Sequence, residues 1–121
     1  MKILIAALSF VLLTAFGCAS TAPVNPQQAV FAAKQSYAVA LTVAVAYKRL
    51  PACTPTSPPL CSKPDVVATL QKVDTASSAL LDAAENTVRT QGAGANVQTA
   101  ITAATQAVAA FTTITQSLVT K

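Results

Sequence analysis

The chain has 121 residues, which is enough for one small domain. It contains eight Lys and Arg against four Asp and Glu, three Cys, and neither His nor Trp; 53% of its residues are apolar and 10% are charged. Histidine is the commonest general base and the commonest metal ligand, so its absence leaves few routes to catalysis or metal binding. We therefore expect a protein that is not an enzyme and that holds no cofactor or metal.

The first residues have the pattern of an export signal. Met1 and Lys2 give a positive start, and residues 3–13 are almost entirely apolar. This run has the length of the apolar region of a signal peptide and falls short of the roughly 20 residues that cross a bilayer as a helix. We expect residues 1–17 to be a cleaved signal peptide. An uncut membrane anchor is the alternative.

The end of this segment, Thr14-Ala15-Phe16-Gly17-Cys18, resembles the lipobox of bacterial lipoproteins, although that class most often has Leu where Ala15 stands. The resemblance implies a diacylglyceryl group on the Cys18 sulfur, cleavage before Cys18 and acylation of the new amino group. Ala19 in place of Asp implies export to the outer membrane of a Gram-negative cell, with the domain facing the periplasm or the surface. An ordinary secreted protein is the alternative.

Proline and glycine positions divide the rest of the chain, because proline breaks helices and glycine ends them. Residues 18–26 contain Cys18 and a polar linker with two prolines, which we expect to be extended. Residues 27–121 form the expected all-α domain, an antiparallel up-down-up three-helix bundle. Its helices are predicted at about 27–50, 65–91 and 95–120.

The first predicted helix is apolar over much of its surface. Residues 35–47 carry no charge, and because 13 residues cannot cross a bilayer, we expect burial against two neighbours. The predicted inner face consists of Val30, Phe31, Ala38, Leu41, Ala44 and Val45.

The other two helices have clearer faces. In the third, apolar residues recur at spacings of four and three, opposite a stripe of Thr and Gln that argues against a membrane span. Its predicted inner face consists of Val97, Ile101, Ala104, Val108, Phe111, Thr115 and Leu118. On the second helix, the predicted inner side consists of Val66, Leu70, Val73, Leu80 and Ala84, with Val67, Leu81 and Val88 beside them. Ser62 or Asp65 is the expected N-cap, and Gly92 or Gly94 suits its end.

Cys53 and Cys61 lie in the proline-rich segment 51–64. In an oxidising compartment, with Cys18 lipidated, they are expected to form a disulfide. A metal or redox pair is the rival, but the spacing is not C-x-x-C. The segment is either a simple connection or a rigid interaction loop, whose candidate residues are Lys48, Arg49, Pro55, Pro58, Pro59 and Lys63.

Few residues suggest chemistry. Asp82 and Glu85 lie close enough on the second helix to form an acid pair, but Lys72 and Arg89 nearby favour an ordinary solvated face. Lys48, Arg49 and Lys63 form a possible basic cluster for anionic glycan, lipid or an acidic partner. We expect neither nucleic acid nor a small-molecule substrate.

Together these patterns predict a membrane-anchored helical lipoprotein of the cell envelope with a structural or protein-interaction role and an unidentified envelope protein as partner. A membrane-active protein that permeabilises lipid is one alternative. The chain also loosely resembles the small Ala-rich lipoproteins of phages and prophages, which act in lysis or superinfection exclusion. A binder or inhibitor that uses the 51–64 loop is the remaining alternative.

Overall fold

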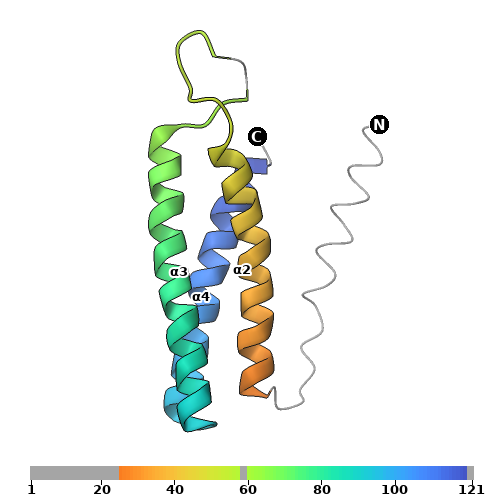
Figure 1. The fold of residues 1–121 in the computed structure, drawn as a ribbon, viewed down its shortest axis with the longest axis vertical. Helices are drawn as coiled ribbons and strands as arrows, with labels where there is room; N and C mark the ends of the chain where they lie inside the picture. The colour runs from red at the N-terminus through yellow and green to blue at the C-terminus, as the bar shows by residue number, and fades with distance from the viewer. Residues whose placement is uncertain (1–24, 58–59, 120–121) are drawn as a thin grey trace, which may run out of the picture.

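The computed structural model describes residues 25–57 and 60–119, and it has three α-helices in this part of the chain: α2 (Pro26–Lys48), α3 (Pro64–Gln91) and α4 (Ala95–Val119). The helices lie side by side and run up, down and up (Figure 1). The loop between α2 and α3 projects from one end of the bundle. The predicted all-α fold with three helices is confirmed, and the described residues contain no β-strand.

A proline opens each of the first two helices. Pro26 and Pro64 lie in the first turns of α2 and α3, so both helices begin one residue earlier than predicted. Proline suits this position because its missing N–H would have no partner inside the helix. At the start of α2, the Asn25 side chain accepts a hydrogen bond from the Gln27 backbone N–H at 3.0 Å.

The predicted cap of α3 is wrong. Its N-cap residue is Lys63, which makes no side-chain capping bond. Asp65 lies inside the first turn, where its negative charge is favourable next to the positive end of the helix dipole. The Ser62 hydroxyl instead donates to the Leu50 carbonyl oxygen at 2.9 Å, so it joins the two ends of the loop.

The turn from α3 to α4 uses glycine as expected. Gly92 is the C-cap of α3, with φ 70°, and its N–H donates to the Val88 carbonyl oxygen at 2.9 Å. Gly94 has φ 139°. Residues with a Cβ rarely adopt such positive φ angles, so glycine is needed at both positions of this short turn.

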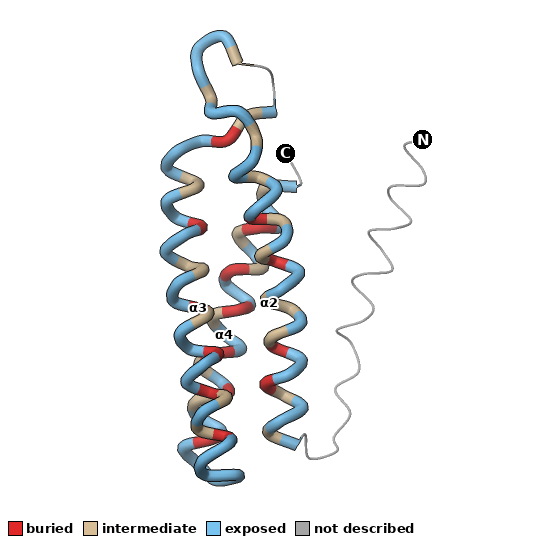
Figure 2. The backbone as a smooth tube through the Cα atoms, in the orientation of Figure 1, coloured by how far each residue is buried: buried red, intermediate tan, exposed pale blue. Residues whose placement is uncertain are grey.

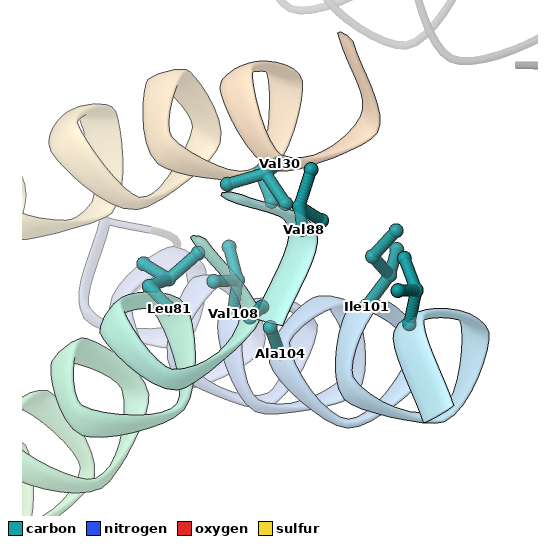
Figure 3. Close-up of a cluster of buried hydrophobic side chains, with 9 residues drawn as sticks. Val30, Leu81, Val88, Ile101, Ala104 and Val108 are labelled. Carbon is teal, nitrogen blue, oxygen red and sulfur yellow. The ribbon is translucent and has the colours of Figure 1, made fainter. Parts of the chain in front are cut away.

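The core consists of two clusters, to which all three helices contribute. Around Phe111, which is fully buried, a smaller cluster contains Ala40, Ala44 and Leu70. The ring of Tyr37 packs against Phe111 with 5.8 Å between ring centroids. The larger cluster, shown in Figure 3, contains Val30, Ala33, Leu81, Ala84, Val88, Val97, Ile101, Ala104 and Val108.

The predicted inner face of α4 is confirmed in all but its last residue: Leu118 is half-buried and the other six are buried. On α3 the prediction is partly wrong, because Leu80 is 37% exposed and Leu81 is buried instead. Ser77 also lies on the buried line of α3. Its hydroxyl donates to the Ala107 carbonyl oxygen on α4 at 3.2 Å, so this buried polar group is satisfied.

The predicted inner face of α2 is wrong for half of its residues: Val30 and Ala44 are buried and Leu41 is half-buried, but the other three are exposed. The helix packs against both α3 and α4, yet Phe31 is 63% exposed, Val45 is 39% exposed and Ala38 is exposed as well. Figure 2 shows the outward side of α2 in pale blue along its length. Small side chains at a contact let helix axes approach closely, and the buried residues of α2 are accordingly Val30, Ala33, Ala40 and Ala44.

We expect Phe111→Ala to lower the free energy of unfolding by about 3–5 kcal/mol, because it leaves a cavity where the three helices meet. Urea unfolding followed by circular dichroism measures the change. Val119→Ala, on a residue that is 70% exposed, is the control and should change the stability by less than about 0.5 kcal/mol. Equal stability of the two variants would contradict this assignment of the core.

Candidate functional site

The loop between α2 and α3 is closed at its base by a disulfide and by hydrogen bonds. Cys53 and Cys61 are bonded, with 4.9 Å between their Cα atoms, as the sequence predicts. The Cys53 N–H donates to the Ser62 carbonyl oxygen at 3.0 Å, and the Ser62 N–H donates to the Pro51 carbonyl oxygen at 2.8 Å. The loop is therefore held at its base by covalent and polar contacts.

Three cations surround the base of this loop. Lys48 is the last residue of α2, Arg49 is its C-cap and Lys63 is the N-cap of α3, and all three are exposed. The Lys63 backbone N–H donates to the Tyr47 hydroxyl at 2.9 Å, which ties the start of α3 to the end of α2. These residues of the predicted interaction loop thus lie at one end of the bundle.

The tip of the loop is polar and exposed. Pro55 lies in a turn in which the Ser57 N–H donates to the Thr54 carbonyl oxygen at 3.0 Å. Pro58 and Pro59, which also belong to the predicted interaction loop, lie outside the described residues. Whether the loop binds anything stays a prediction.

An ion pair joins α2 to α3 at the other end of the bundle. The Lys34 ammonium contacts the Glu85 carboxylate, and Arg89 contacts the same carboxylate at 2.6 Å. The hydrogen bond and charge of Lys34, followed by those of Arg89, hold the pKa of Glu85 below its ordinary value. A general acid needs a raised pKa, so this site does not favour acid catalysis by Glu85.

A second polar contact joins the same helices near their middle. The Tyr37 hydroxyl donates to the Asp74 carboxylate at 2.5 Å. Burial, and then the hydrogen bond and charge of Asp74, raise the pKa of Tyr37 to about 12. The hydroxyl therefore stays protonated at neutral pH and serves as a hydrogen-bond donor. Sequence reasoning missed both cross-helix contacts.

Grooves flank α2 on both sides. Between α2 and α4 lies a groove of about 550 Å³ that is lined only by Ala, Ser, Thr and Val residues. Between α2 and α3 lies one of about 320 Å³, where Phe31 is next to Lys34, Glu85 and Arg89. Neither groove is enclosed, so both are features of the surface around α2.

The outward side of α2 is the most unusual surface of the described residues. We call it the outer face of α2; its members are exposed and uncharged, namely Phe31, Gln35, Ala38, Val39, Thr42 and Ala46. By length and composition α2 is able to cross a membrane, and it is the one such helix among the described residues. The mean hydropathy of its most apolar window is 1.4, although only 17% of that window is buried. The uncharged run 35–47 is the sequence signal that could have revealed this surface.

No family model, curated protein or solved structure matches this chain. Within the ranges that the structure describes, no group of three or more His, Cys, Asp or Glu side chains is placed to hold a metal ion. Cys18, on which the lipobox resemblance depends, lies outside these ranges. The exposed outer face of α2 and the disulfide loop are therefore the two candidate interaction surfaces.

We expect Glu85→Gln to destabilise the chain at neutral pH and to have no effect in acid. Because the pKa of Glu85 is lowered in the folded state, its stabilising contribution is complete above the ordinary pKa and is lost as the pH falls through the lowered pKa. Urea midpoints of both proteins, measured as the pH falls from neutral to well below the ordinary pKa of a glutamate, should draw together toward the acid end. Asp82→Asn, on an exposed acid of the same helix, is the control; a gap that persists in acid would refute the prediction.

We expect the double variant Cys53→Ser/Cys61→Ser to lose about 2–3 kcal/mol of stability, because the open chain gains conformational entropy when unfolded. The helix content should be unchanged, since the contacts among the three helices do not involve the loop. Thermal unfolding followed by circular dichroism measures both the stability and the helix content. Thr56→Ser, an exposed change in the same loop, is the control, and an unchanged unfolding temperature in the double variant would show that the disulfide does not brace the fold.

Proposed function

We propose that the chain is a lipoprotein of the bacterial cell envelope whose helical bundle is a non-catalytic interaction module. Its leader, residues 1–17, is removed, and Cys18 carries the lipid. The support for this location is the sequence Thr14-Ala15-Phe16-Gly17-Cys18 after a short apolar run. Ala19 supports the outer membrane as its destination.

The observation that carries the interaction role is the exposure of large apolar side chains on α2. Phe31 is 63% exposed and Val39 is 62% exposed, on a helix whose buried positions are mostly alanine. Isolated exposed apolar residues are common, but a run of uncharged, mainly apolar residues along one helix is typical of a surface that contacts something. The described side chains therefore favour an interaction role over a catalytic one.

The lipid anchor would confine the helical bundle to the membrane surface. One acyl chain holds a protein only marginally and two or more hold it firmly, so a fully acylated Cys18 would keep the bundle on the membrane. Confinement to one surface raises the effective concentration of the module for a partner there. We propose an envelope protein as that partner, with the braced loop around Arg49 and Lys63 as its contact.

The test of this function is the lipid on Cys18. When the full chain is expressed in a Gram-negative host with a palmitate analogue that can be detected, the wild type should carry the label and fractionate with the outer membrane. Mass spectrometry should find a product that begins at Cys18. Cys18→Ser should lose the label completely and keep its leader.

The cysteines of the loop give a matched control. Cys53→Ser/Cys61→Ser should be labelled and anchored as the wild type is, because Cys18 remains. Label that survives in Cys18→Ser, or a wild-type product with a free thiol at Cys18, would refute the lipoprotein assignment.

A further inference from the structure

The buried positions of α2 are mostly alanine, whereas two of its large apolar residues are exposed. Ala33, Ala40 and Ala44 are buried, whereas Phe31 and Val39 are both more than 60% exposed. Exposed apolar area is unfavourable in water, roughly in proportion to its size. The outer face of α2 is therefore a surface that gains from being covered.

The acidic residues of the bundle are confined to one helix, which also carries Lys72 and Arg89. All four acidic residues of the chain lie on α3, namely Asp65, Asp74, Asp82 and Glu85. α2 has no acid; its charges are Lys34, which is the ninth of its 23 residues and pairs with Glu85, and Lys48 at its end, followed by Arg49. Exposed cations such as Lys48 and Arg49 beside an uncharged helix face favour contact with an anionic membrane, where long cationic side chains reach the headgroups.

The tether leads directly to this helix. From Cys18 to Pro26 the linker is eight residues long, which spans at most about 25 Å at about 3.1 Å per residue. α2 has 23 residues and is therefore about 34 Å long. A lipid on Cys18 would keep the start of α2 within reach of the bilayer, so α2 can lie along the membrane without unfolding.

From these three observations we propose that the outer face of α2 lies on the anionic surface of the membrane that holds the chain, so that the bundle rests on its side. The proposal depends on the lipid anchor described above. A second copy of the chain is a poorer occupant because of its charges. If two α2 helices paired in parallel, Lys48 and Arg49 of one copy would meet the same cations of the other. An antiparallel pair is an outcome that the experiment distinguishes.

A single tryptophan tests the orientation, because the chain has none. Val39→Trp places the reporter on the outer face of α2, and Ala79→Trp places a matched reporter on an exposed position of α3. The lipidated full-length variants are reconstituted in vesicles of phosphatidylcholine and phosphatidylglycerol, with or without bromine on the acyl chains. Phe31→Trp is a conservative second reporter, and circular dichroism verifies the helices of each variant.

We expect Trp emission of Val39→Trp to shift to the blue and to fall by about half with brominated lipid, since interfacial side chains lie at the acyl boundary. Phe31→Trp should respond in the same way. Ala79→Trp should be quenched by iodide in the water and should not respond to bromine. Vesicles of phosphatidylcholine alone should reduce the response at position 39.

Three results would overturn the proposal. Equal iodide quenching at positions 39 and 79 on floating vesicles would mean that the bundle stands upright. Protection at position 39 without bromine quenching would mean that a second copy or another protein covers α2. Bromine quenching at position 39 that is as strong on vesicles of phosphatidylcholine alone as on anionic vesicles would refute the role of charge. Flotation reports the anchor separately: if no variant floats with the vesicles, the lipid on Cys18 has failed as well.

Discussion

The packing of α2 against its two neighbours is the contact that decides which of its residues stay exposed. It is made chiefly by alanines, of which Ala33, Ala40 and Ala44 are buried. Each contributes little apolar area, and Tyr37 adds contacts with both the ring of Phe111 and the carboxylate of Asp74. The polar contacts between α2 and α3 therefore accompany small side chains at the interface.

Most of the helix layout can be predicted from the sequence, because a few residues determine it locally. Pro26 and Pro64 have no N–H to donate and so fix where α2 and α3 begin. The inner side of α4 is equally clear, since apolar residues occupy one side and Thr and Gln the other. The orientation of α2 is different: apolar residues occur on nearly all of its sides, so periodicity gives no direction and only packing decides that Phe31 faces out.

The two candidate surfaces also differ in how far the sequence predicts them. The Cys53–Cys61 bond can be predicted because both cysteines lie in one short segment. The Lys34–Glu85 pair cannot, because its members are 51 residues apart and meet only when α2 and α3 adopt one particular register. That pair and the contact between Tyr37 and Asp74 are compatible with the register that packing gives the two helices.

An odd number of helices places the two ends of the described chain far apart. α2 begins at the end of the bundle opposite the disulfide loop, whereas α4 finishes on the same side as that loop (Figure 1). A fluorescent protein or affinity tag joined after α4 would consequently sit beside Cys53 and Cys61, a full helix length away from the point where the leader enters. Such a fusion would leave the start of α2 unobstructed while crowding the cations at the base of the loop, so the position of a tag decides which of the two surfaces can still be studied.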